Sequence, residues 1–209
     1  MVAVGFYWWL NGCFASRRVA TESRTDVYEE VEASSLIAKL QGMNDRIVPE
    51  PRAVYPESAF EAAITEVVRA LLDGIDHAVV PRFGLDIAVF RKSAEGSRVS
   101  LIEVKSFNGQ RQGGFGFGNG RGEGPQVDLL LCNSDQMNII NKHIRWAFVN
   151  ARLPDRSSRY ALISSSQALS IVMGEVKKGK QNNFSVSRLA PHLTSWQVFC
   201  EELSNFLLN

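Results

Sequence analysis

Glutamate and lysine stand two residues apart at two places in the sequence. The first pair lies in Glu103–Lys105, within LIEVKSFNG, and the second lies in Glu175–Lys177, within MGEVKKGK. Because residues i and i+2 of a β-strand point to the same face, each pair would place a carboxylate beside an ammonium group. A carboxylate can bind Mg²⁺, and a neighbouring lysine can orient a water that the metal activates. The alternative for either copy is a cross-strand ion pair on a wet surface.

A metal site of this kind needs a second carboxylate on a neighbouring strand. Asp86 lies in LDIAVF, just before the Glu103 strand, and the turn AEGS could bring the two strands together. A third carboxylate is expected from the helix ESAFEAAITEVVRALLDG, where Glu61 lies beside the apolar face. Glu66 points nearly the opposite way and is expected to face water. These residues favour the first copy as a catalytic site.

The second copy has a poorer setting. Pro154-Asp155 precedes it, but the polar stretch RSSR follows this aspartate, and the helix before it offers no glutamate. We therefore interpret Lys177, Lys178 and Lys180 as an exposed turn, with contact to phosphates as the alternative role.

The helix with Glu61, the strand with Asp86 and the strand ending in Glu103–Lys105 resemble the PD-(D/E)xK phosphodiesterase superfamily. These restriction-endonuclease-like nucleases include restriction enzymes, Holliday junction resolvases and transposon end nucleases, and AFEAAI is similar to the helix entry of the resolvase-like branch. The resemblance covers roughly residues 57–165. Leu85 stands where the family often has proline.

The resemblance implies a fold, a cofactor and roles for single residues. The fold is α/β, with a restriction-endonuclease-like αβββαβ core and a mixed central sheet flanked by helices. The cofactor is Mg²⁺, with Mn²⁺ as the alternative. Asp86, Glu103 and Val104 would be metal ligands, Lys105 the catalytic lysine and Glu61 an accessory catalytic residue. The implied activity is endonucleolytic hydrolysis of DNA.

The elements that must position these residues can be read from hydrophobic periodicity and turn signals. Residues 1–50 are expected to form an N-terminal extension with one helix at 26–41, and residues 51–209 the nuclease-like domain. In that domain the sequence predicts a helix at 57–73, a three-stranded meander at 77–107, a helix at 134–150, a strand at 159–165, a hairpin of 168–176 with 183–189, and a helix at 194–208.

Two regions could contact the DNA backbone. The segment 106–125 holds eight glycines, with Arg111 and Arg121 among them, and is either a flexible loop or a loop that orders on DNA. The basic stretch 140–190, which includes Lys142 and Arg145, is either a solvated surface or a phosphate-binding face. We predict DNA contacts for these four residues.

Composition and cysteine usage set the remaining expectations. The chain has 209 residues and a formal net charge of +1, so overall charge does not indicate nucleic-acid binding. Its three cysteines form no disulfide framework, which favours the cytoplasm, and its N-terminal apolar run is too short to span a bilayer. Cleavage of both DNA strands would be served by a homodimer. The alternative to the endonuclease is a catalytically silent DNA-binding or assembly module.

Overall fold

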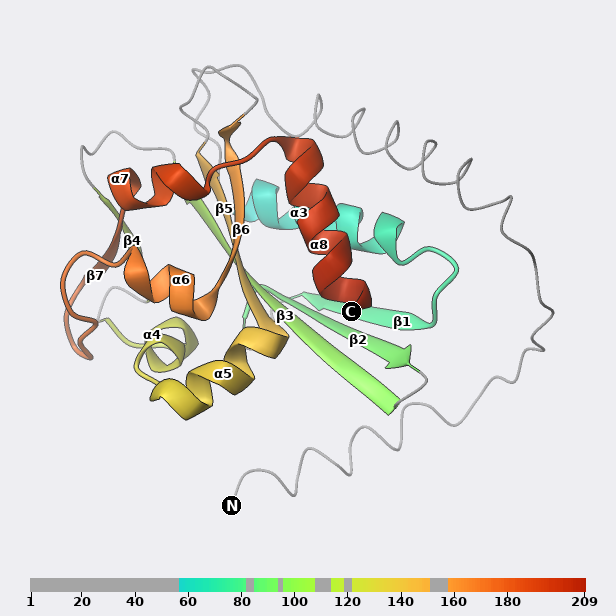
Figure 1. The fold of residues 1–209 in the computed structure, drawn as a ribbon, viewed down its shortest axis with the longest axis horizontal. Helices are drawn as coiled ribbons and strands as arrows, with labels where there is room; N and C mark the ends of the chain where they lie inside the picture. Colours follow the sequence, from blue (N-terminus) through green and yellow to red (C-terminus); the bar gives the residue numbers. More distant parts are fainter. Residues whose placement is uncertain (1–56, 82–84, 94–95, 108–113, 119–121, 151–157) are drawn as a thin grey trace. The chain divides into compact units, whose positions relative to one another are not determined.

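A computed structural model of the chain describes residues 57–81, 85–93, 96–107, 114–118, 122–150 and 158–209. These residues form a mixed α/β fold in which helices flank a central sheet (Figure 1). The predicted N-terminal extension, residues 1–50, lies outside the described residues.

The central sheet has the strand order β1-β2-β3-β5-β6. As predicted, β1, β2 and β3 form an antiparallel meander. The chain then returns so that β5 lies parallel to β3, and β6 pairs antiparallel with β5. The strands run His77–Pro81 (β1), Ile87–Ser93 (β2), Gly96–Phe107 (β3), Ile144–Asn150 (β5) and Tyr160–Ser164 (β6).

Two helices cover one face of this sheet, and both were predicted from sequence. Helix α3 spans Glu57–Leu71 and helix α8 spans Trp196–Leu208. Their apolar stripes, including Phe60, Ile64, Phe199 and Leu203, pack on residues of β2, β3 and β5 in one buried cluster. Burial of these side chains stabilises the position of α3 against the strands.

The other face carries smaller elements around an aromatic cluster. A second sheet pairs β4 (Gly114–Phe117) with β7 (Asn182–Ser185), and α4 (Pro125–Leu130) and α6 (Ser165–Ser170) add buried residues. Helix α5 (Ser134–His143) packs beside α6. After β7, α7 (Val186–Leu189) and a 3-10 turn (Ala190–His192) lead to α8.

The predicted helix at 134–150 is wrong in its second half. Helix α5 ends at His143, and Ile144–Asn150 forms strand β5. The run is buried on both faces of the sheet, so its hydrophobic residues are nearly continuous, and periodicity cannot separate such a strand from a buried helix. The N-cap is Asn133, directly before the predicted start of the helix, and it forms a capping box with Gln136.

The predicted hairpin at 168–176 and 183–189 is reduced to a single antiparallel bridge with two backbone hydrogen bonds, Met173 N to Asn183 O and Ser185 N to Ile171 O. Ser164 and Gln167 form a capping box that starts helix α6 in the first of these segments. Strand β7 in the second segment pairs with β4 of the glycine-rich region, and only Val172 bridges back to Phe184. At the last helix, Ser195 is the N-cap that receives a hydrogen bond from Val198 N, whereas the Thr194 side chain donates to Tyr160 O.

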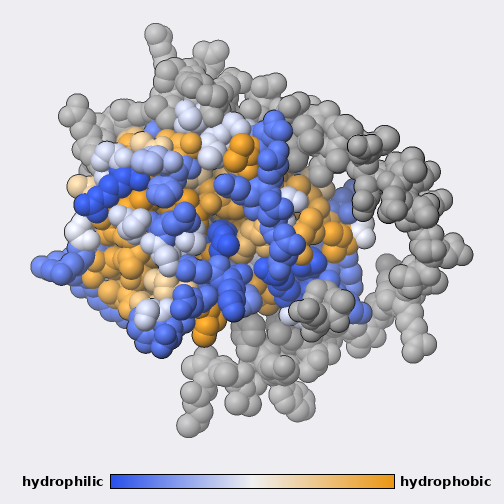
Figure 2. Space-filling view, in the orientation of Figure 1, coloured by the Kyte–Doolittle hydropathy of each residue, from blue (hydrophilic) through white to orange (hydrophobic). Residues whose placement is uncertain are grey.

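The surface of the described part mixes polar and apolar residues. Figure 2 shows broad hydrophilic areas with hydrophobic patches between them. Large apolar side chains such as Ile139 and Met173 are exposed singly, as is usual for folded proteins. Within the described ranges, no helix has the length and apolar character needed to cross a membrane.

Candidate active site

The C-terminal half of β3 places charged and apolar side chains on opposite faces. Val104 points into the core under α3 and α8, with Ile102 beside it. Glu103 and Lys105 alternate with Val104 and therefore share the other face. Glu103 is 0% exposed and Lys105 is 6% exposed, so this is a buried charge cluster and not an ion pair on a wet surface.

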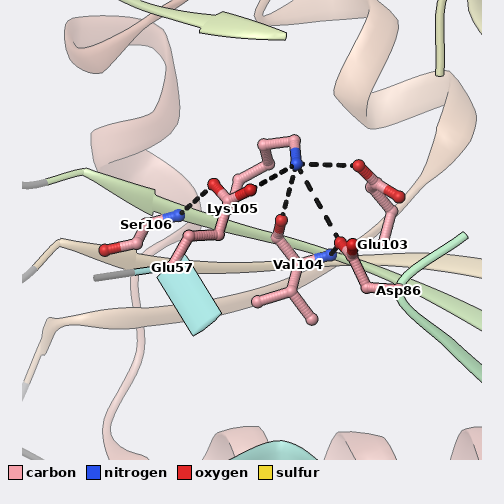
Figure 3. A network of polar contacts seen from close by, with 6 residues as sticks. All are labelled: Glu57, Asp86, Glu103, Val104, Lys105 and Ser106. Carbon is pink, nitrogen blue, oxygen red and sulfur yellow. Dashed lines mark hydrogen bonds and ion pairs between the residues drawn. The ribbon is translucent and has the colours of Figure 1, made fainter. Parts of the chain in front are cut away.

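The Lys105 ammonium lies among oxygens from three parts of the chain (Figure 3). Its Nζ lies 2.7 Å from Glu103 Oε1 and donates a hydrogen bond of 2.8 Å to the carbonyl oxygen of Val104. It also donates to Glu57 Oε1 at 3.0 Å and lies 4.0 Å from Asp86 Oδ2. Four oxygens of charged or carbonyl groups therefore face one nitrogen.

Asp86, at the entry to β2, is held in place by the neighbouring strand. Its Oδ2 accepts a hydrogen bond of 2.7 Å from the backbone N–H of Val104. Asp86 Oδ2 lies 4.0 Å from Lys105 Nζ, and Glu103 Oε1 lies 2.7 Å from the same nitrogen. The distance between the two carboxylate oxygens therefore cannot exceed the sum of these two distances. The meander thus brings together the two carboxylates that the sequence paired.

Helix α3 contributes Glu57 to this cluster. Besides its bond to Lys105, Glu57 accepts a hydrogen bond of 3.3 Å from the backbone N–H of Ser106. Glu61, the residue favoured from the sequence, lies one turn further along the helix, and its role stays a prediction. Glu66 is exposed and pairs with Arg69 at 2.6 Å, as expected for a residue that faces water. The four-residue spacing of Glu57 and Glu61 was the available signal for Glu57.

Burial dominates the electrostatics of Glu103. Burial raises the pKa of Glu103 from 4.5 to about 7; the Lys105 ammonium opposes this rise and the Asp86 carboxylate adds to it. For Lys105, burial alone would lower the pKa, but Glu103 and Glu57 outweigh it and raise the pKa above its ordinary value. Lys105 is therefore charged at neutral pH, while Glu103 is poised near its titration point.

The donor set fits a hard divalent cation. Both side-chain oxygens of Glu103 are buried, and the Lys105 ammonium and the Gln126 side chain stabilise the ionised carboxylate. Among the described residues, no three His, Cys, Asp or Glu side chains form a group that could hold a metal by themselves. Mg²⁺ does not need such a group, because it commonly binds one or two carboxylates and keeps several waters. Asp86, Glu103 and the Val104 carbonyl supply oxygens of the required kind.

Gln126 is a residue whose role the sequence did not reveal. It lies in the first turn of α4, and its side chain lowers the pKa of Glu103. A glycine-rich stretch directly before it hides the helix start, where Pro125 at the first position was the available signal.

The second Glu-Val-Lys copy is an exposed ion pair. Glu175 and Lys177 lie 3.2 Å apart, with side chains 83% and 54% exposed, outside any strand. Lys178 and Lys180 are exposed as well, which confirms the predicted turn. Solvent screening leaves such a pair little energetic weight.

The predicted DNA-contacting residues fall into two groups. Arg111 and Arg121 lie outside the described residues. Arg145 of β5 lies on the sheet face that α8 covers, which is opposite to Glu103 and Lys105, and Lys142 at the end of α5 lines the same pocket. The structure does not bring them together with the charge cluster.

Comparisons of the chain with protein-family models, with curated proteins and with solved structures found no match. Membership of the PD-(D/E)xK superfamily therefore stays a prediction from the residues.

Proposed function

We propose that the protein is a Mg²⁺-dependent endonuclease that hydrolyses phosphodiester bonds of DNA. The observation that carries this proposal is the convergence of Asp86, Glu103, the Val104 carbonyl and Lys105 at the end of β3. The order of the elements, a helix followed by a three-stranded meander, helices and a parallel strand, supports a restriction-endonuclease-like core.

Each residue has a defined task in this proposal. Asp86, Glu103 and the Val104 carbonyl would hold the metal, which when bound lowers the pKa of water and stabilises charge on the phosphate. Lys105 is charged and fixed by several oxygens, so it can orient the attacking water and stabilise negative charge as it develops. Glu57 positions Lys105 through a direct ion pair.

The second candidate is a catalytically silent DNA-binding or assembly module. One observation favours it: the Lys105 ammonium already forms close ion pairs with Glu57 and Glu103, so the cluster can also serve as a purely structural ion network. The two candidates differ in one measurable property, which is cleavage.

Supercoiled plasmid with Mg²⁺ provides the direct test. Wild-type protein is expected to nick or linearise the plasmid, and EDTA to stop the reaction. Asp86→Ala and Lys105→Ala should each abolish cleavage, since removing one group that stabilises transition-state charge costs about 10²–10³-fold. Lys177→Ala is the matched control from the exposed copy and should cleave at the wild-type rate. Activity that survives Lys105→Ala but is lost in Lys177→Ala would reverse the choice of site, and an inactive wild type would favour the silent module.

Glu57→Gln should separate positioning of Lys105 from direct catalysis. Loss of the ion pair is expected to slow cleavage by about fivefold, the effect of roughly 1 kcal/mol. Because Glu57 helps raise the pKa of Lys105, the fall of activity at alkaline pH should begin at lower pH in the variant. Glu66→Gln, on the exposed side of the same helix, should change neither the rate nor the pH profile. An unchanged profile in Glu57→Gln would contradict the positioning role.

A further inference from the structure

A basic pocket lies on the face of the sheet opposite to the Lys105 cluster. Its volume is about 830 Å³, which is in the range of small-ligand sites. The start of β3, the end of α5 and the last turn of α8 contribute to its lining. Its charged and titratable lining side chains are Arg91, Arg98, Lys142, His143 and Arg145, and in the described part of the chain no aspartate or glutamate side chain lines it. Asn209, the last residue of the sequence, also lines it.

Three of the arginines gather on one side of three neighbouring strands. Arg91 on β2 and Arg98 on β3 are direct cross-strand partners. Arg145 on β5 pairs in register with Ile102 of β3, and its guanidinium lies 4.6 Å from the ring centre of Phe206. Like charges directly opposite in a sheet are destabilising. The pocket therefore concentrates positive charge at an energetic cost that a bound anion would relieve.

Capping of helix α8 uses only part of the donors that these arginines carry. Arg91 donates to the Leu208 carbonyl at 2.8 Å and Arg98 to the Phe206 carbonyl at 3.5 Å, as basic residues often do at a helix C-terminus. Each guanidinium has five N–H groups. The buried Nε atoms of Arg91 and Arg98 have no hydrogen-bond partner among the described residues. Beyond these bonds to the α8 carbonyls, the Arg91 and Arg98 guanidinium groups, which line the pocket, still carry N–H donors.

Arg145 is held in a fixed orientation beside them. Its Nη1 donates to the Ile144 carbonyl at 2.9 Å and also to the Asn141 carbonyl. Burial lowers the pKa of Arg145, and the nearby positive charge of Arg98 lowers it further. An oriented guanidinium loses little conformational entropy when it binds a ligand.

We propose that this pocket binds a phosphate group, carried either by a free mononucleotide or by the end of a polynucleotide. Several planar guanidinium groups match the oxygens of a phosphate, with which arginine forms paired, charge-assisted hydrogen bonds. The site is separate from the proposed nuclease centre. Arg98 and Lys105 lie on opposite faces of β3 and seven residues apart, which is roughly 20 Å along the strand. The inference does not rest on DNA cleavage.

Calorimetric titration of the full chain in EDTA and low salt tests the proposal without involving catalysis. The probes are inorganic pyrophosphate, adenosine 5′-monophosphate, succinate, and one short oligonucleotide with and without a 5′-phosphate. We expect pyrophosphate to bind, and Arg98→Ala to weaken its binding at least about tenfold. Arg69→Ala, at an exposed arginine on α3, is the matched control and should bind like the wild type.

If Arg98→Ala does not fold, Lys142→Ala replaces it in the test. Lys142 lines the pocket but is exposed, so its replacement should leave the fold intact. It should weaken pyrophosphate binding by about threefold, as the loss of one surface charge near a phosphate does. Tighter binding of the mononucleotide would identify a free ligand, and a requirement for the 5′-phosphate on the oligonucleotide would identify a polynucleotide end. No binding of any phosphate probe, equal affinity in wild type and both pocket variants, or succinate binding as tight as pyrophosphate would overturn the assignment.

Discussion

Glutamine in place of Glu103 is expected to abolish DNA cleavage and, in the same protein, to raise stability at alkaline pH. Glutamine has nearly the same shape as glutamate but cannot supply the negative charge that a divalent cation requires. The buried carboxylate is expensive to ionise, since burial raises the pKa of Glu103 to about 7. One substitution should therefore move activity and stability in opposite directions.

The sign of the stability effect follows from linkage. The folded-state pKa of Glu103 lies above its ordinary value of 4.5, so the folded protein holds this proton more tightly than the unfolded chain does. The stabilisation is complete below about pH 4.5 and is lost as pH rises to about 7. In EDTA, the wild type should lose on the order of 3 kcal/mol across this window from this group, and Glu103→Gln should not.

Urea denaturation at a series of pH values measures this difference. The two proteins should have similar unfolding free energies at pH 4 and should diverge by pH 8, with the variant more stable. Glu175→Gln, in the exposed copy of the motif, is the control and should follow the wild-type curve. Parallel curves for wild type and Glu103→Gln would show that Lys105 compensates fully for the buried charge.

Alanine at Phe184 is expected to cause the largest loss of stability. The ring is 0% exposed. It lies with centroid distances of 4.3 Å to Phe117, 5.2 Å to Phe148, 5.5 Å to Trp146 and 5.6 Å to Phe115. Removal of a buried phenylalanine costs about 3–5 kcal/mol, because the cavity that it leaves closes only in part.

Chemical denaturation followed by tryptophan fluorescence measures this loss. Ile139→Ala, on a side chain that is 64% exposed, should stay within about 0.5 kcal/mol of the wild type. A loss below about 1 kcal/mol in Phe184→Ala would mean that β4 and β7 do not pack on the central sheet as the aromatic distances indicate.

The sequence predicted the elements whose patterns are local. The amphipathic helices α3 and α8 and the meander of β1, β2 and β3 are confirmed, because their periodicity and turns are visible within short windows. The convergence of Asp86 and Lys105 also followed from the meander, since a hairpin brings adjacent strands side by side.

The features that the sequence could not predict depend on contacts between distant segments. Strand β5 was read as helix because its burial on both faces comes from partners elsewhere in the chain. The glycine-rich segment contributes β4 and core phenylalanines only because β7 pairs with it about 70 residues later in the chain. The start of α3 was predicted correctly, but which of its glutamates contacts Lys105 depends on how the helix packs on the sheet. Gln126 enters from the start of α4, and helix boundaries are the least predictable part of a helix.

The long sequence separation within the charge cluster has a consequence during protein synthesis. Glu57 and Lys105 are 48 residues apart, and β3 gains its second neighbouring strand only when β5, ending at Asn150, has been made. A growing chain that has emerged only as far as Phe107 thus contains every acidic partner of Lys105 but not the strand and helix that enclose them. Contacts between residues distant in sequence form late in folding. Water is therefore excluded from the charge cluster only at a late stage of folding. The charge cluster is therefore fully enclosed only after strand β5 has been made and has paired with β3.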